Sequence, residues 1–457
     1  MKINLLEGIL LLLVASFAVV PAQALEIRGA VATGDSSWNP QNFAGFDYDM
    51  DRDIGTEMLT TNLTDGTLSG DEPYGIIYET NKNNKEFSNA RIGMEYGLLQ
   101  VSSIDPATGN ITLDNRGKSI SLNRGENIEI MPDIYIRAAN SYWDGLRYYV
   151  YKNITKQGTY EIRGSVAGTV NGANNLYDNR FSWTADNFAG FYYDMDDNIK
   201  TEELTTTVSD GKLLEPDGVV YKTKAMADGF DFDAWGEFIV IGFMGEKYFA
   251  GYLDTADTTD DVLFERSDDE NALSDEQLLK ILRDEETKIT VKKGQSLKLD
   301  EGYELFFQGL NIDDGQIYLE LKKNGKLVDE SILAPNRYMA SMYDKTYCYR
   351  MDVGSSRNIV TIAVHFTKAY QDNERSLAIV DAIWQLSESS IEVKENTQFG
   401  KMTVATVTAD SIIMNNKRNQ IDLDPDTDLE LMPRIFLRTA NNDTLRYCIY
   451  KTETVGK

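Results

Sequence analysis

Histidine is almost missing from this chain of 457 residues, which contains only His365. Because His365 lies inside the apolar run "NIVTIAVHF", it is interpreted as a packed or edge side chain of a strand and not as a catalytic one. Ser-His-Asp, Cys-His and multi-histidine metal sites are therefore set aside. Phosphate-binding and nucleophile-elbow motifs are also missing. We predict that the protein is not an enzyme, with no catalytic residue and no cofactor-binding residue.

Cysteine is scarce as well, with Cys348 and Cys448 the only two. Two cysteines in a chain of this length exclude a disulfide framework. Cys448 stands in "LRYCIYK", and the matching earlier segment "LRYYVYK" has Tyr149 at that position. The fold therefore does not require sulfur there, and the sequence leaves open whether the two cysteines pair.

The chain has few basic residues relative to acidic ones, and few long apolar runs. Asp and Glu number 73 against 45 Lys and Arg, which gives a formal net charge of −28. This excess excludes a phosphate-binding surface for nucleic acid and favours cations or basic partners. The apolar run 9–20, followed by Ala22-Gln23-Ala24, predicts a secretory signal peptide over residues 1–24. No other run is long enough to span a membrane, so we expect a secreted protein.

What the chain does contain is an internal repeat. Residues 42–51 read "NFAGFDYDMD" and residues 187–196 read "NFAGFYYDMD". Apolar and acidic residues alternate in both, which predicts a half-buried strand. Further pairs follow, "IEIMPDIYIRAAN" with "LELMPRIFLRTAN" and "LRYYVYK" with "LRYCIYK". Tyr and Phe are abundant, as in β-rich proteins.

The two copies differ in the segment between their halves. It is short in the first copy, residues 81–95, and long in the second, residues 224–398. Because both halves are kept in both copies, residues 26–80 are expected to pack against 96–152, and the long segment is expected to fold by itself. The predicted division is a signal peptide (1–24), a first β-sandwich repeat (25–158), a second repeat in two pieces (159–223 and 399–457) and an insert (224–398).

The sequence thus predicts an all-β fold of tandem β-sandwich domains, the second of them discontinuous, with an inserted β-rich domain that carries one short helix. Asn324-Gly325 predicts a hairpin turn in the insert. Ser274 and Gln277 have the spacing of a capping box, and the leucine-rich residues 278–282 behind them predict the helix.

Two kinds of candidate site remain. The aspartates kept in both copies are metal-ligand candidates, although the loop lacks the glycine of an EF-hand, and the simpler interpretation is a solvated strand face: Asp49, Asp51, Asp194 and Asp196. The only cofactor considered is a divalent cation, Ca²⁺ or Mg²⁺, at acidic surfaces. N-x-S/T sequons predict glycan acceptors, against chance occurrence in an Asn-rich chain, at Asn62, Asn110, Asn153 and Asn442.

These motifs, together with "WGEFIVIGFMGEKYFAGY" and "EGYELFFQGLNIDDGQIYLELKKNGKLVD", resemble the surface-layer (S-layer) proteins of methanosarcinal archaea over essentially the whole mature chain. The resemblance implies tandem two-sandwich modules, glycosylated, which tile the cell exterior as a lattice that acts as wall and sieve. The partners it implies are further copies of this chain or other S-layer subunits. The first copy lacks an insert, and the chain stops at "TETVGK" where the family continues into a stalk and membrane helix. It therefore looks like a shortened relative without an anchor.

Two other functions are weighed against this structural role. A secreted adhesin or carbohydrate-binding protein is the alternative, with Tyr142 and Trp143 as the candidate sugar platform. An envelope hydrolase would need a pair of carboxylates in a cleft, and no particular pair stands out among the 73 acids.

Overall fold

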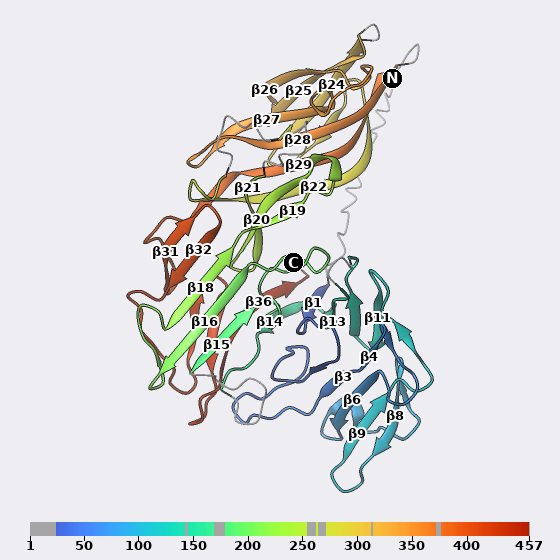
Figure 1. The fold of residues 1–457 in the computed structure, drawn as a ribbon, viewed down its shortest axis with the longest axis vertical. Helices are drawn as coiled ribbons and strands as arrows, with labels where there is room; N and C mark the ends of the chain where they lie inside the picture. Colours follow the sequence, from blue (N-terminus) through green and yellow to red (C-terminus); the bar gives the residue numbers. More distant parts are fainter. Residues whose placement is uncertain are drawn as a thin grey trace, which may run out of the picture.

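The computed structural model describes residues 24–141, 145–168, 179–253, 262–263, 271–311, 314–371 and 376–456. Antiparallel sheets make up an elongated molecule (Figure 1). The first repeat (blue to teal) and the second (green and red) lie side by side, and the yellow and orange strands of the insert extend away from them. The predicted all-β class is confirmed. Within the described ranges, no helix has the length and apolar character needed to cross a membrane. The predicted signal peptide lies outside them except for residue 24.

The first repeat has two main sheets and one small sheet. One sheet has the order β1 (Leu25–Arg28), β13 (Tyr148–Ile154), β12 (Ile134–Ala138) and β11 (Asn127–Met131). The other has the order β2 (Ser36–Trp38), β3 (Met58–Thr61), β6 (Ile76–Asn81), β9 (Asn110–Asp114), β8 (Leu99–Ile104) and β7 (Glu95–Tyr96). The small sheet contains β10 (Ile120–Ser121), β5 (Thr67–Leu68) and β4 (Leu63–Thr64), and a 3-10 turn, η1 (Lys85–Phe87), lies between β6 and β7.

The two halves of the first repeat pair across the linker. β6 pairs with β9, which places Ile77 opposite Asp114, and β1 pairs with β13. Between the sheets, the fully buried rings of Trp38 and Tyr148 lie 6.1 Å apart, edge to face. The prediction that residues 26–80 pack against 96–152 is confirmed.

The second repeat has the same plan. One sheet has the order β14 (Gly158–Arg163), β36 (Tyr447–Val455), β35 (Ile435–Thr439) and β34 (Asp428–Met432). The other has the order β30 (Gln398–Phe399), β31 (Met402–Thr408), β32 (Ser411–Asn415), β18 (Val219–Lys224), β16 (Glu202–Ser209), β17 (Lys212–Leu213) and β33 (Ile421–Asp422), with β15 (Arg180–Thr184) also paired to β16. Because β18 pairs with β32, the two pieces of this repeat join in one sheet on either side of the insert.

The insert also consists of sheets. The larger has the order β19 (Met226–Gly229), β20 (Glu237–Phe243), β21 (Glu246–Tyr252), β22 (Gln277–Lys292), β29 (Ser376–Glu392), β28 (Ser356–Gln371) and β27 (Thr346–Val353). The smaller has the order β23 (Ser296–Lys298), β24 (Tyr303–Asn311), β25 (Gln316–Lys323) and β26 (Lys326–Leu333). A 3-10 turn, η2 (Asp233–Trp235), and a short helix, α1 (Met342–Lys345), complete it.

The predicted hairpin is confirmed. Asn324 and Gly325 join β25 to β26 with φ of 49° and 79°, the left-handed pair that a type I′ turn requires. An alanine at position 325 would have to adopt this left-handed conformation, although nothing lies within 4 Å of its Cβ position.

We therefore expect Gly325→Ala to lower the free energy of unfolding by about 1 kcal/mol, the cost of placing a Cβ in the left-handed region. Gly34→Ala is the matched control, because Gly34 has no positive φ and open space around it. Urea denaturation of both variants measures the difference. Equal stability of the two variants would contradict this account of the turn.

The helix predicted over residues 274–282 is wrong, because that segment enters strand β22. The side chain of Gln277 does not cap a helix: it accepts a hydrogen bond from Ser390 and donates one to Ser355. Leu278 and Leu279 are buried within the sheet between β21 and β29. Pairing with two strands outweighs the local helical pattern. The helix that exists is α1, whose capping box is formed by Ser341 and Asp344.

The repeated segments 42–51 and 187–196 are also not strands. The backbone turns twice in the first copy, since the N–H of Phe43 donates to Asn39 and that of Phe46 donates to Phe43. A further bridge joins Asp49 to Ile54, and the second copy repeats the pattern. The alternation was real, but it reflects a loop whose phenylalanines fill the core while its aspartates face outward.

The insert does not have a wholly separate core. Ile241, Phe243 and Met244 of the insert belong to the hydrophobic core of the second repeat. The ring of Phe243 lies 6.1 Å from Tyr221 and 5.3 Å from Phe399. In the first repeat, Phe87 of the short linker takes the same place between Tyr78 and Tyr96. Each connection therefore supplies aromatic packing to its repeat, while most of the insert's buried residues form clusters of their own. The expectation that the insert folds by itself stays a prediction.

Candidate functional site: the junctions between the repeats and the insert

The two repeats hold each other through reciprocal arginine contacts. Arg446 of the second repeat donates from Nε to the carbonyl of Met50 and from Nη2 to that of Asp51, both at 2.9 Å. Arg147 of the first repeat makes the same two bonds, at 3.0 Å each, to Met195 and Asp196. The loop of each repeat is thus bound by an arginine of the other repeat. The duplicated loop and the duplicated "LRY" segment are therefore the two sides of these contacts.

A second reciprocal pair of arginines lies in the same repeat interface. The guanidinium of Arg28 donates to the carbonyl of Ala185 and lies 4.9 Å from the ring centre of Tyr193. Arg163 donates to the carbonyl of Pro40 and lies 5.2 Å from the ring of Tyr48. Burial lowers the pKa of both arginines, but partners on carbonyls and aromatic faces keep them charged.

The four candidate metal-binding aspartates lie on these loops. Oδ1 of Asp51 accepts the N–H of Asn441 at 2.7 Å, and Oδ1 of Asp196 accepts that of Asn140 at 2.6 Å, so both carboxylates fasten the repeat interface. Asp49 and Asp194 accept N–H groups of their own loops. Within the described residues, no three acidic, histidine or cysteine side chains are grouped so as to hold a metal ion. A cation at these aspartates stays a prediction.

Two cavities are lined by residues of both repeats. One, of about 420 Å³, is lined by Asp49 and Asp51 together with Arg163 and Arg438 of the other repeat. The other, of about 700 Å³, is lined by Asp194 and the matching arginines of the first repeat. Arg438 is held by both carboxylate oxygens of Glu161, at 2.8 and 3.0 Å, so its charge is already neutralised.

The junction between the second repeat and the insert is centred on Glu202, which is 3% exposed. Its carboxylate accepts the hydroxyl of Tyr221 at 2.8 Å and the backbone N–H groups of Tyr192 at 2.8 Å and Gly245 at 2.9 Å. Beside it, Thr201 accepts the N–H of Gly242 at 2.7 Å. A Cβ on Gly242 would lie 2.7 Å from Glu202, so only glycine permits this approach. Sequence reasoning missed Glu202, although the Thr-Glu pair recurs as Thr56-Glu57.

The protonation of Glu202 couples folding to pH. Burial raises its pKa to about 7, against hydrogen bonds from Tyr192, Gly245 and Tyr221 and the charge of Lys451, which act to lower it. Between the unfolded pKa near 4.5 and the folded value, the folded state holds a proton that the unfolded state has lost. The stabilisation is therefore complete below about pH 4.5 and is lost as the pH rises through 7.

We expect the difference in unfolding free energy between the wild type and Glu202→Gln to shift by about 3 kcal/mol, in favour of the variant, as the pH rises from 4.5 to 7.5. Urea denaturation at a series of pH values measures it. Every other titrating group is common to both proteins and cancels in the difference. A difference that stays constant with pH would contradict the protonation of Glu202 in this range.

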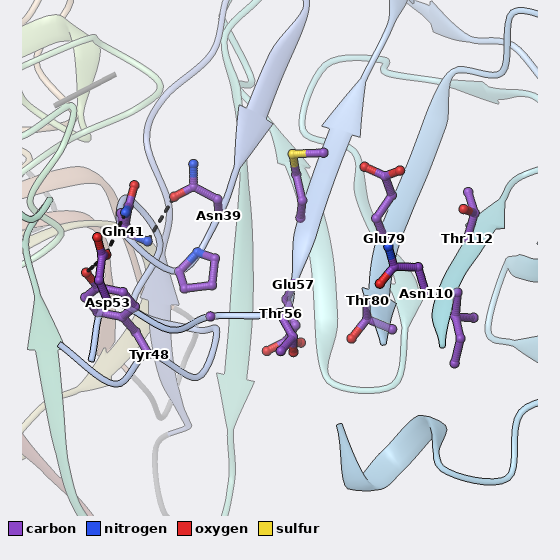
Figure 2. Close-up of a pocket in the computed structure, with 14 residues that line it drawn as sticks. Asn39, Gln41, Tyr48, Asp53, Thr56, Glu57, Glu79, Thr80, Asn110 and Thr112 are labelled. Carbon is purple, nitrogen blue, oxygen red and sulfur yellow. Dashed lines mark hydrogen bonds between the residues drawn. The ribbon is translucent and has the colours of Figure 1, made fainter. Parts of the chain in front are cut away.

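The first repeat keeps the same polar residues without an insert over them. Glu57 accepts the hydroxyl of Tyr78 at 2.7 Å and the N–H of Asp47 at 3.2 Å. Around it lies an open cavity of about 400 Å³ (Figure 2). Its lining is mostly polar and includes Thr56 and Thr80. The site that the insert fills in one repeat is thus open in the other.

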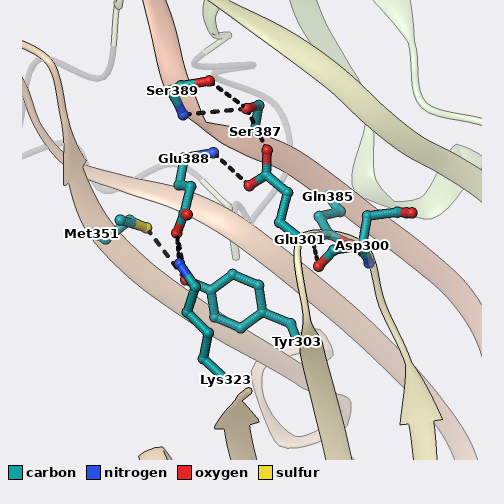
Figure 3. A network of polar contacts seen from close by, with 9 residues as sticks. All are labelled: Asp300, Glu301, Tyr303, Lys323, Met351, Gln385, Ser387, Glu388 and Ser389. Carbon is teal, nitrogen blue, oxygen red and sulfur yellow. Dashed lines mark hydrogen bonds and ion pairs between the residues drawn. The ribbon is translucent and has the colours of Figure 1, made fainter.

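A polar network joins the two sheets of the insert (Figure 3). Glu388 binds Lys323 and accepts the hydroxyl of Tyr303 at 3.2 Å. Glu301 accepts the hydroxyl of Ser387 at 2.6 Å and the N–H of Glu388 at 3.0 Å. Both carboxylates are engaged by partners that hold β24 and β25 to β29. The network fastens two sheets together and presents no free acid pair for hydrolysis.

The remaining candidates take structural positions. His365 is 5% exposed, with Nδ1 2.5 Å from Oδ1 of Asp381, so its predicted packed role is confirmed. Cys348 and Cys448 are both free thiols. Of the sequon residues, Asn110 and Asn442 are exposed, and Asn62 and Asn153 are half-buried. The amide of Asn442 donates to Asp51 at 3.1 Å, and that of Asn62 to Tyr74 at 2.8 Å. Tyr142 and Trp143 lie outside the described residues.

Comparison with known proteins agrees with this architecture. The model of the S-layer protein family matches residues 172–441, more than half of the chain. The Major S-layer protein of Methanosarcina barkeri is 28% identical over 361 residues, which is 77% of this chain and 48% of that protein. Those of Methanosarcina acetivorans (29% over 371 residues) and Methanosarcina mazei (28% over 370) each match 79% of this chain and 50% of the relative. The chain spans about half the length of these curated relatives. It belongs to the S-layer protein family.

Proposed function

We propose that this protein is a structural subunit of the cell envelope, secreted to the cell surface, where it forms or joins a two-dimensional S-layer lattice. The observation that carries the proposal is the family match over residues 172–441, which includes the second repeat's repeated loop and the whole insert. A fold of sheets fastened by reciprocal arginines and closed polar networks supports a load-bearing role rather than a catalytic one.

The test is electron microscopy of the purified secreted chain, alone and mixed with solubilised S-layer subunits. Ordered sheets, or incorporation of the labelled chain into existing sheets, are the expected results. A chain that stays monomeric under both conditions and is absent from the envelope fraction would overturn the proposal.

The same proposal divides the chain into three units: a first sandwich (25–158), a second sandwich (159–223 with 399–457) and an insert (224–398). The separate pairing of their sheets supports this division, while the shared core around Phe243 ties the insert to the second sandwich. We also propose glycans on the sequon asparagines, first of all on Asn110, which is exposed at the start of β9. Mass spectrometry of tryptic peptides would identify the occupied residues.

Divalent cations are proposed to bridge acidic surfaces of neighbouring subunits, with the loops of Asp49 and Asp194 as contributors. The net charge of −28 supports this, because facing acidic surfaces repel each other unless counterions lie between them. We expect a chelator to reduce the particle size of assemblies measured by light scattering, and added Ca²⁺ or Mg²⁺ to restore it. An unchanged size after chelation would contradict cation bridging.

A further inference from the structure

The insert covers a face of the second repeat that the first repeat leaves open. Ile199 is 1% exposed because it packs into the core of the insert, whereas the corresponding Ile54 of the first repeat is 53% exposed. Met58 on the neighbouring strand is 38% exposed. The polar residues under the insert, Thr201 and Glu202, recur here as Thr56 and Glu57. We call the surface around Ile54, Thr56, Glu57 and Met58 the open face.

The open face is acidic. The two cavities that meet at Thr56 and Glu57 (the first shown in Figure 2) are lined by one ammonium group, that of Lys85, and by six carboxylates: those of Asp47, Asp49, Asp53, Glu57, Glu79 and Glu86. In the second repeat, Lys247 of the insert lies 5.9 Å from the ring of Tyr192. Its ammonium group pairs with Asp228 of the insert at 2.5 Å and is also attracted by Asp194, the residue that corresponds to Asp49. A group that covers the open face should therefore be apolar and positively charged.

The chain carries a surface of this kind at the far end of the insert. Tyr338 and Met339 are 88% and 85% exposed, the highest values among the large apolar side chains that the structure describes. Arg337 beside them, which pairs with Asp344 at 3.5 Å, and Lys368 on β28 are exposed cations. Over the segments 332–345 and 366–371 the formal charge is +2, from three cations and one aspartate, in a chain of −28. We call residues 336–343 the tip loop.

The tip loop is rigid, which lowers the entropic cost of docking it. The side chain of Asn336 clamps the backbone of Ala369, donating to its carbonyl at 2.6 Å and accepting its N–H at 3.0 Å. The capping box of Ser341 and Asp344 fixes the other end of the loop. Met339 is held at φ 57°, so its side chain and that of Tyr338 are presented to solvent by a constrained backbone. Exposed apolar side chains on such a frame are typical of interface anchors.

We propose that the open face of the first repeat binds the tip loop of a second copy of this chain. One molecule cannot bring its own two surfaces together, because β26 and β6 lie at opposite ends of its long axis (Figure 1). A head-to-tail contact between different surfaces leaves one free copy of each surface at the ends of every pair, so further copies can add to it. The inference rests on the proposed function, for which it names one inter-subunit contact.

The experiment is sedimentation velocity of the secreted chain at increasing concentration. Ile54→Lys and Arg337→Glu are each expected to weaken self-association at least tenfold, since one places a cation in the open face and the other removes a cation from the tip loop. Leu214→Lys is the matched control, because Leu214 is a comparable exposed residue (43%) of the second repeat that lines neither surface. The double variant Glu79→Lys with Arg337→Glu reverses both charges and should regain most of the association.

The outcomes separate the two proposals. Association that persists unchanged in Ile54→Lys and Arg337→Glu overturns this contact and leaves the proposed function standing. A wild-type chain that stays monomeric at every concentration, alone and with S-layer subunits, and is absent from the envelope fraction overturns the proposed function itself. A monomeric chain that instead co-sediments with anionic lipid vesicles through Arg337 assigns the tip loop to a membrane surface and also overturns the contact.

Discussion

Glu202→Ala is expected to lower the free energy of unfolding by about 3 to 5 kcal/mol and to loosen the insert on the second repeat. The substitution removes the acceptor for two buried N–H groups and one buried hydroxyl, and each buried donor left without a partner costs about 1–3 kcal/mol. Part of this cost is offset because a buried carboxylate no longer has to be desolvated. Chemical denaturation measures the stability. Hydrogen exchange at Gly242 and Gly245 reports on the junction, since their N–H groups bond to Thr201 and Glu202.

Glu57→Ala in the first repeat is the matched control. Glu57 is half-buried and accepts one hydroxyl and one longer N–H bond, so solvent can replace part of what is lost. We expect Glu57→Ala to lower the free energy of unfolding by about 1 kcal/mol. Equal losses for the two glutamates would show that the insert does not depend on Glu202, and would contradict the central role given to this residue.

The second large effect is expected at the repeat interface. Arg446→Ala removes two charge-assisted bonds to backbone carbonyls of the other repeat, and Arg147→Ala removes their counterparts. We expect each single variant to lower the free energy of unfolding by about 3 kcal/mol, because a hydrogen bond to a charged group contributes about 1.5–3 kcal/mol. The double variant should cost about 5 kcal/mol, less than the sum, since both arginines stabilise one interface. Denaturation gives these values, and small-angle X-ray scattering should show a larger radius of gyration for the double variant.

Arg357→Ala controls for the loss of an arginine as such. The side chain of Arg357 is 72% exposed and pairs with Asp352 at the surface, so its removal should cost less than about 1 kcal/mol. If Arg446→Ala matched Arg357→Ala in stability and the double variant kept its radius of gyration, the repeats would be held together by other contacts.

Much of the fold was predictable because it depends on patterns that the sequence repeats. The pairing of residues 26–80 with 96–152 followed from two half-repeats retained on either side of connections of very different length. Asn324-Gly325 predicted its turn because few other residue pairs adopt two successive left-handed conformations. His365 was correctly interpreted as packed because apolar residues surround it in the strand.

The errors arose where local patterns have two explanations. Residues 278–282 have the spacing of an amphipathic helix, yet they lie in β22 because strands on both sides bond to that segment, and only Leu278 and Leu279 are buried. The alternation in residues 42–51 is as regular as in a strand, but turns at Phe43 and Phe46 bend the backbone. Short periodic segments take the conformation that their neighbours can pair with.

The sequence alone determined the β class, the duplicated sandwich with its insertion point, and the acidity that favours basic or cationic partners, because these follow from composition and from similarity between distant segments. Only the tertiary structure decided that Asp51 and Asp196 fasten one repeat to the other, that Phe243 packs in the core of the second repeat, and that Glu57 and Glu202 differ in what covers them. These properties depend on which surfaces meet, and residues such as Arg446 and Met50, 396 positions apart, are brought together only by folding.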